Sequence, residues 1–128
     1  MTAPRQAMLA PRYAAIAGLV GRGEWTTYGD VSVAVHGSAR FARHVGRAAA
    51  RFAPFPNALR VLASGGAVAA GWRGANGEGP DACRARLERE GVHFTAGRAD
   101  PARRVTWEAL IQRADAASLP RASTIALF

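Results

Sequence analysis

The chain has 128 residues, which is enough for one folded domain with a modest core and too few for two independent ones. Its 17 lysine and arginine residues stand against 9 acidic residues, a net charge of +8, and all 17 are arginine. A GC-rich genome accounts for the choice of arginine over lysine, but not for the excess of positive charge. That excess indicates a polyanionic partner.

The same composition disfavours several functional classes. The single cysteine, Cys83, excludes a disulfide within the chain, and the three histidines show no metal-ligand spacing, so we expect neither a metal site nor a cofactor. No apolar run approaches the roughly 20 residues of a membrane span, and the N-terminus lacks the apolar segment of a signal peptide. We expect a soluble, monomeric, cytoplasmic and nucleoid-associated protein without membrane contact.

The first third of the chain predicts a helix-turn-helix. Apolar side chains at helical spacing over residues 12–20 indicate a first helix that stops at two glycines. After a short extended piece, Thr27 can cap a second helix over 28–35, and the glycine-containing turn at 36–38 places Ser38 to cap the next. Short helices joined by such a turn form a helix-turn-helix.

The third predicted helix, residues 39–52, separates into faces when its side chains are placed at roughly 100° per residue. One face is apolar and should point to the core, and arginines lie opposite it beside a stripe of small residues. From residue 31 to residue 77 there are six arginines and no acid, which favours DNA contact over a merely soluble face. The core face is Phe41, Val45, Ala48 and Phe52, the basic face is Arg40, Arg43, Arg47 and Arg51, and the small stripe is Ala42, Gly46 and Ala50.

The rest of the chain predicts a small β-hairpin and two further helices. Segments 59–62 and 67–70 flank a Ser-Gly-Gly turn, which is typical of a hairpin or wing. A glycine-rich loop follows, and helices are expected over 81–90 and 106–114 with a strand at 92–95 between them.

These elements predict an α+β, mostly helical fold: a winged helix-turn-helix DNA-binding domain with a small β-hairpin. The expected organisation is an N-terminal extension at 1–11, the domain at 12–116 and a C-terminal tail at 117–128. Trp25 and Trp107 are expected to be core residues.

Several short motifs follow one another in an order typical of one family. GRGEWTTYGDVSVAVHG at 21–37 and FARHVGRA at 41–48 resemble the DNA-binding half of alkylguanine-DNA alkyltransferases. The family's Pro-Cys-His-Arg-Val active-site strand corresponds to residues 57–61, its glycine hairpin to 64–66, and its Leu-x-x-Glu-Gly helix end to 87–91. The resemblance covers about residues 12–113.

The chain departs from this family at the position of the alkyl-accepting cysteine, which is Ala58. Asn57 replaces the family's proline and Leu59 replaces its histidine, so the nucleophile and its base partner are both absent. Cys83 is expected to be a small, partly buried residue. The combination resembles the alkyltransferase-like proteins, which bind alkylated guanine without repairing it. The resemblance implies no catalytic residue, double-stranded DNA as partner, and nucleotide excision repair proteins as further partners.

The resemblance also implies a mechanism, in which the recognition helix enters the minor groove and the target base is flipped out. Tyr28 would push the phosphate of the target nucleotide, and Arg43 would fill the space that the base leaves. His44 stands where the family usually has alanine, so it would contact the groove or obstruct deep entry. The expected DNA-binding residues are Thr27, Tyr28, Arg40, Ala42, Arg43, His44, Gly46, Arg47 and Arg51, and the expected base pocket is Ala58, Arg60, Val61, Trp72 and Arg73.

Two other functions stay open at this point. One is a winged-helix module for undamaged DNA, in regulation or genome defence, that has lost the lesion pocket along with the chemistry. The other is an enzyme with a different nucleophile, which would require Cys83 to be reactive.

Overall fold

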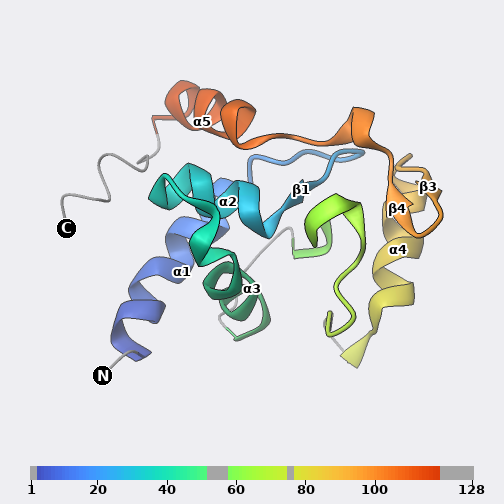
Figure 1. The fold of residues 1–128 in the computed structure, drawn as a ribbon, viewed down its shortest axis with the longest axis horizontal. Helices are drawn as coiled ribbons and strands as arrows, with labels where there is room; N and C mark the ends of the chain where they lie inside the picture. Colours follow the sequence, from blue (N-terminus) through green and yellow to red (C-terminus); the bar gives the residue numbers. More distant parts are fainter. Residues whose placement is uncertain (1–2, 52–57, 75–76, 119–128) are drawn as a thin grey trace.

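The computed structural model describes residues 3–51, 58–74 and 77–118, which form an α+β fold made mainly of helices, as predicted (Figure 1). Short 3-10 helices are labelled η. The elements are α1 (Ala3–Ala17), β1 (Thr26–Thr27), α2 (Tyr28–His36), η1 (Ala39–Phe41), α3 (Ala42–Arg51), η2 (Ala58–Arg60), β2 (Val61–Leu62), η3 (Ser64–Gly66), α4 (Pro80–Arg89), β3 (Phe94–Thr95), β4 (Arg98–Ala99), η5 (Pro101–Arg103) and α5 (Trp107–Ala116).

The helix-turn-helix forms as the sequence predicts. The side chain of Thr27 caps α2 by accepting the backbone N–H of Asp30 at 2.9 Å, and Gly37, in the left-handed region at φ 77°, ends the helix. The fully buried Ser32 then joins the two halves, since its hydroxyl donates to the carbonyl of Ser38 and accepts the backbone N–H of Phe41 at 3.2 Å. These bonds fix the start of the third helix relative to α2.

Two predicted helices have different bounds in the structure. The helix predicted at 12–20 begins much earlier, at Ala3, and ends at Ala17. The helix predicted at 39–52 is divided into η1 and α3, because Ser38 caps a single 3-10 turn before the α-helical hydrogen bonds begin.

The β-hairpin predicted from segments 59–62 and 67–70 is wrong. Val61 and Leu62 instead pair in parallel with Thr26 and Thr27, and residues 67–70 form no strand. Val61 and Leu62 are both fully buried, which suits a parallel strand covered on both faces and not the edge of an exposed wing. The structure forms its hairpin later in the chain, between β3 and β4.

Two apolar clusters meet along the β1–β2 pair. Val61 belongs to a cluster with buried residues of α1, α2, α3 and α5, whereas Leu62 belongs to a second cluster that holds Trp25 and Leu87. Trp25 is therefore in the core, as predicted. The same prediction for Trp107 is wrong: this side chain is 39% exposed, because it stands at the first position of α5 on the outer side of the helix.

Asp30 ties α5 to the start of α2. Its carboxylate is buried and accepts two hydrogen bonds from the guanidinium of Arg104, at 2.9 and 3.0 Å, and one from the backbone N–H of Trp107 at 3.2 Å. The hydroxyl of Thr27 donates to the same carboxylate at 2.8 Å. Hydrogen bonding to Asp30 raises the pKa of Arg104. The segment before α5 is thereby held beside the N-terminus of α2.

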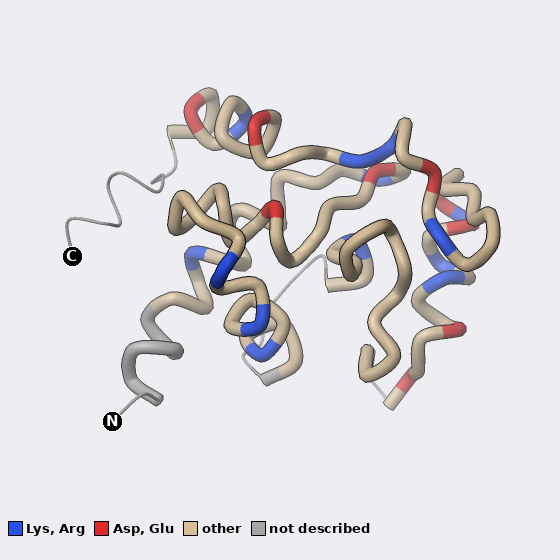
Figure 2. Tube along the Cα trace, in the orientation of Figure 1, with Lys and Arg blue, Asp and Glu red and all other residues tan. Residues whose placement is uncertain are grey.

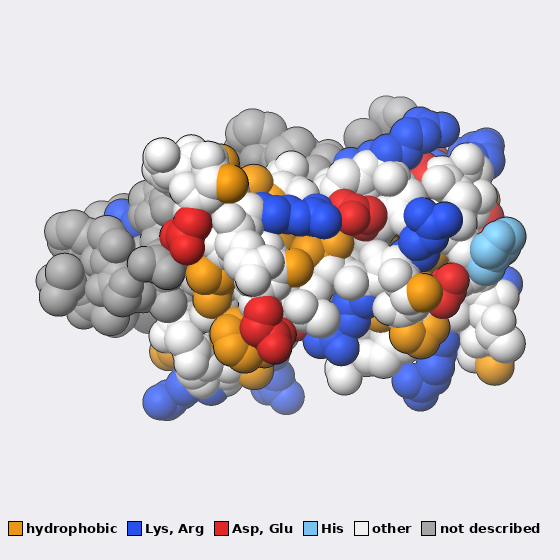
Figure 3. Space-filling view, turned by 90° about the horizontal axis from the view of Figure 1, so that it is seen from above, with side chains coloured by type: hydrophobic (Ala, Val, Ile, Leu, Met, Phe, Trp, Pro, Cys, Tyr) orange, Lys and Arg blue, Asp and Glu red, His pale blue; other side chains and the backbone are white. Residues whose placement is uncertain are grey.

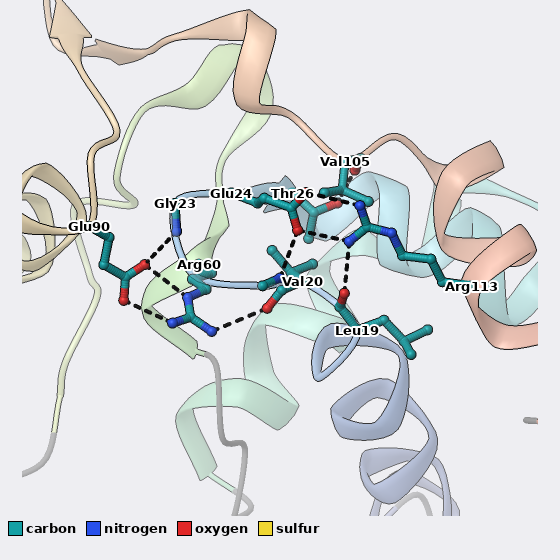
Figure 4. A network of polar contacts seen from close by, with 10 residues as sticks. Leu19, Val20, Gly23, Glu24, Thr26, Arg60, Glu90, Val105 and Arg113 are labelled. Atoms are coloured by element: carbon teal, nitrogen blue, oxygen red, sulfur yellow. Dashed lines mark hydrogen bonds and ion pairs between the residues drawn. The ribbon is translucent and has the colours of Figure 1, made fainter. Parts of the chain in front are cut away.

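A second ion pair joins α5 to the loop after α1 (Figure 4). The guanidinium of Arg113 donates to both oxygens of Glu24 at 2.8 and 2.9 Å, and to the carbonyl of Leu19 at 2.9 Å. These hydrogen bonds are the main reason that the pKa of Glu24 falls from its ordinary 4.5 to about 2.

This shift predicts how folding stability depends on pH. The carboxylate of Glu24 stabilises the fold fully above pH 4.5, and its contribution disappears as the pH falls from 4.5 towards 2. Urea unfolding at pH 5 and pH 3 should therefore show a smaller acid-induced loss of stability in Glu24→Gln than in the wild type. Equal losses in both proteins would contradict this role for Glu24.

Candidate nucleic-acid interface

The arginine face predicted from the sequence lies on η1 and α3. Arg40, Arg43 and Arg47 are exposed, and Figure 2 shows basic residues following one another along this part of the chain. Among the described residues none of these three forms an ion pair. The side chain of Arg51 lies outside the described part of the chain. Three charged groups are thus available to an external anion.

The predicted core face of η1 and α3 is only partly buried in the structure. Val45 and Ala48 are buried in the first cluster, whereas Phe41 is half-buried at the helix start. The ring of Phe41 lies 4.3 Å from that of His36 and 5.5 Å from that of His44, measured between centroids. His44 is therefore partly buried against an aromatic neighbour. Phe52, also predicted to face the core, lies outside the described residues.

An open pocket of about 180 Å³ lies next to the arginine face. Its wall combines the start of α2, one side of α3, η2 and the loop that follows η3. Most of the lining side chains are small, with two aromatic rings and one guanidinium. The lining residues are Tyr28, Gly46, Ala49, Ala50, Ala58, Ala69, Gly71, Trp72 and Arg73.

The two aromatic walls of the pocket are held in different ways. Tyr28 is the first residue of α2 and half-buried, and burial raises the pKa of its hydroxyl. Trp72 is 8% exposed, and its indole N–H donates to the carbonyl of Ala58 at 3.4 Å. Its ring lies against Gly74, where an added Cβ would come within 2.6 Å of the indole. Arg73, which is exposed, donates to the Trp72 carbonyl at 2.9 Å.

Five residues were predicted for a base pocket, and three of them line the pocket described above: Ala58, Trp72 and Arg73. The other two, Val61 and Arg60, do not line this pocket. Val61 is fully buried in the core, and the guanidinium of Arg60 donates to both oxygens of Glu90 at 2.9 and 3.0 Å and to the carbonyl of Val20 at 3.2 Å (Figure 4). Arg60 therefore braces η2 against the end of α4 and does not point into the pocket.

Four lining residues were not predicted as pocket residues: Ala49, Ala50, Ala69 and Gly71. Ala50 was already placed beside Gly46 in the predicted stripe of small residues, and Ala49 follows Gly46 by three residues, so helical periodicity could have added it to the same side of α3. Ala69 and Gly71 carry no such signal, because the path of their loop depends on its packing.

Cys83 was predicted to be partly buried, and in the structure it lies fully buried in α4. Its thiol donates to the carbonyl of Leu59 at 3.3 Å, immediately behind the pocket residue Ala58. Burial raises the pKa of the thiol to about 12. A thiolate at this position is therefore scarce at neutral pH.

The Cys83 thiol should accordingly resist alkylation and disulfide exchange while the protein is folded. We expect a disulfide reagent at pH 8 to react at least about a hundredfold more slowly with the native protein than with the same protein in denaturant. Absorbance of the released thiol measures both rates. A fast native reaction would restore Cys83 as a candidate nucleophile.

Other kinds of site have no support in the part of the chain that the structure describes. Within residues 3–51, 58–74 and 77–118, no group of histidine, cysteine and acidic residues could hold a metal ion. In the same ranges no helix has both the length and the apolar character needed to cross a bilayer.

No protein-family model matches the sequence, and none of the curated proteins matches it. Among solved structures the chain is similar to Atl1 of S. pombe, an alkyltransferase-like protein in complex with damaged DNA containing O6-carboxymethylguanine. The two chains share 26% identity with a TM-score of 0.54, and the similarity covers 69% of this chain and 80% of Atl1. The family resemblance predicted from the sequence motifs is confirmed, and the chain has the alkyltransferase-like fold.

Proposed function

We propose that this protein binds double-stranded DNA and recognises O6-alkylguanine or a similarly modified base without repairing it. The observation that carries the proposal is the pocket beside the arginine face, which shares α3 with that face. A protein that reads a base outside the stack needs a phosphate-binding surface and an adjoining pocket with a stacking side chain. Atl1, which has a similar structure, was solved with damaged DNA, and this supports the proposal.

In the proposed mechanism α3 enters the minor groove, and the arginines of η1 and α3 that are exposed have different roles. Arg40 and Arg47 contact phosphates and so position the protein. Arg43 enters the base stack in place of the flipped nucleotide, while Tyr28 presses on its phosphate. Unstacking costs a few kcal/mol, less for a poorly paired alkylguanine, so the modified base is flipped more readily than guanine.

The pocket chemistry supports reading without reaction. The methyl group of Ala58 cannot accept an alkyl group, and the thiol of Cys83 is buried behind Leu59 with a raised pKa. Trp72 supplies aromatic surface for a base, and Arg73 supplies hydrogen-bond donors at the same pocket. We further propose that the protein acts as a monomer in the cytoplasm, associated with the nucleoid, and passes the lesion to nucleotide excision repair proteins.

A titration of matched duplexes tests this function. One duplex contains guanine and the others O6-methylguanine or O6-carboxymethylguanine at the same position, each measured by fluorescence anisotropy at several salt concentrations. We expect tighter binding to the modified duplexes and no mass increase of the protein after incubation. Equal affinities would instead favour a module for undamaged DNA, and an alkylated protein would identify an enzyme.

Variants of the arginine face should separate positioning from base replacement. Arg47→Ala should weaken binding to every duplex alike and reduce the slope of log K against log salt by about 0.9, because one phosphate contact is lost. Arg43→Ala should instead reduce the preference for the modified duplex about tenfold, or about 1.4 kcal/mol. The proposed division of roles fails if both variants change affinity and preference in the same way.

A further inference from the structure

A second arginine surface lies away from α3, where three segments of the chain meet. The loop after α1 reaches the end of α4 through the backbone N–H of Gly23, which donates to Glu90 at 3.3 Å. The same loop reaches η5, because the backbone N–H of Trp25 donates to the carbonyl of Arg103 at 3.1 Å. Each segment contributes one exposed arginine: Arg22, Arg89 and Arg103.

Two acids lie near these arginines, since Glu90 interacts electrostatically with Arg22 and Glu24 with Arg103. Each of these carboxylates is bonded to another guanidinium, Glu90 to Arg60 and Glu24 to Arg113, by two hydrogen bonds (Figure 4). Among the described residues, Arg22, Arg89 and Arg103 form no ion pair. These three exposed guanidinium groups therefore keep hydrogen-bond donors available to an external anion.

The two groups of basic residues lie in different parts of the molecule. Figure 2 shows basic residues on α3 at the lower centre of the molecule and another group at the upper right, around η5 and α4. Viewed from above, arginine side chains gather over the half of the molecule that carries these later elements (Figure 3). A duplex held by α3 would leave this upper surface uncovered.

We propose that Arg22, Arg89 and Arg103 bind the phosphate backbone of a second segment of duplex DNA while α3 holds the first. This inference rests on the proposed function. The duplex backbone carries one negative charge per about 1.7 Å of its axis, so guanidinium groups from three separate elements can each find a phosphate without a matched sequence.

The surface is better suited to phosphates than to an acidic peptide. The backbone N–H groups of Gly21 and Gly23 are already bonded, to Glu24 at 2.8 Å and to Glu90 at 3.3 Å, so the loop has few amides left for a peptide main chain. Peptide recognition generally uses sheet edges, grooves or apolar anchors, whereas phosphate positioning needs only guanidinium groups.

A two-duplex capture experiment tests the proposal. The full-length protein is loaded on a biotinylated duplex on beads, and a fluorescent duplex of different sequence is then added. We expect the wild type to capture the fluorescent duplex, and Arg22→Ala/Arg103→Ala to capture about tenfold less, as expected for two lost phosphate contacts. The double variant should keep the wild-type preference for O6-methylguanine on a single duplex.

The control variant removes the same number of charges elsewhere. Arg84→Ala/Arg86→Ala removes two arginines of α4 that already form partly exposed ion pairs, with Glu88 and with Glu78 before the helix, and should capture the second duplex like the wild type. Three results would overturn the proposal. In the first, the wild type binds the first duplex and captures no second one, and in the second, Arg22→Ala/Arg103→Ala captures as much as the wild type. In the third, this surface binds polyglutamate more tightly than it binds DNA. If the wild type binds no single duplex at all, the proposed function itself has failed.

Discussion

Replacing Asp30 by alanine is expected to lower the free energy of unfolding by about 3 kcal/mol, because a buried carboxylate with several donors is removed at once. The donors left behind include the backbone N–H of Trp107 and the hydroxyl of Thr27. Arg104 would lose its partner as well, but its side chain is 41% exposed and can be hydrated by water. Urea unfolding at pH 7 measures the change.

Arg104→Ala is the matched control for this prediction. It leaves the buried carboxylate of Asp30 without its cation but with the donors from Thr27 and Trp107, so it should also destabilise the fold, by less than Asp30→Ala. A loss of equal size in both variants would show that the charge pair alone matters, and that the buried bonds of Asp30 to Thr27 and Trp107 contribute little. An unchanged stability in Asp30→Ala would contradict the proposed clamp between α2 and α5.

The helix-turn-helix was predictable because its signals are local. Thr27, Gly37 and Ser38 act within a few residues of their own positions: one caps α2, one ends it in the left-handed region, and one caps η1. Each of these effects depends on a side chain and its neighbouring backbone, so no knowledge of the rest of the fold is needed.

The strand pairing was not predictable in the same way. Val61 and Leu62 are followed by a Ser-Gly-Gly turn, the usual local signal for a hairpin, yet they pair in parallel with residues more than thirty positions earlier. The buried environment on both sides of β2 selects this partner. A local sequence pattern indicates that a segment can form a strand, but not which strand it pairs with. The parallel pairing depends on how the apolar side chains of distant segments are buried together.

One pocket residue, Ala58, was predictable because the family motif supplied its position, and Trp72 was predicted from the glycine-rich loop. The direction of a side chain was not predictable where a long-range hydrogen bond decides it. Arg60 is in the same motif, but Glu90, thirty residues later, holds its guanidinium away from the pocket. Nothing in the local sequence around Arg60 indicates this partner.

Filling the pocket should abolish lesion preference without abolishing DNA binding. Ala58→Phe places a ring in a space of about 180 Å³ that Tyr28 and Trp72 already border, so an extruded base can no longer enter. The arginine face on α3 is unchanged, and its phosphate contacts supply most of the affinity for unmodified DNA. We therefore expect equal affinity for guanine and O6-methylguanine duplexes, with the affinity for the guanine duplex within about twofold of the wild type.

Ala85→Phe makes the same substitution at an exposed position of α4 that does not line the pocket, and should leave both affinities as in the wild type. Thermal unfolding of both variants checks that the fold is retained. If Ala58→Phe still prefers the modified duplex, the base is read outside this pocket, and Trp72 is not its stacking partner. If it loses affinity for all duplexes equally, the pocket and the arginine face act as one surface, and the division between positioning and recognition is wrong.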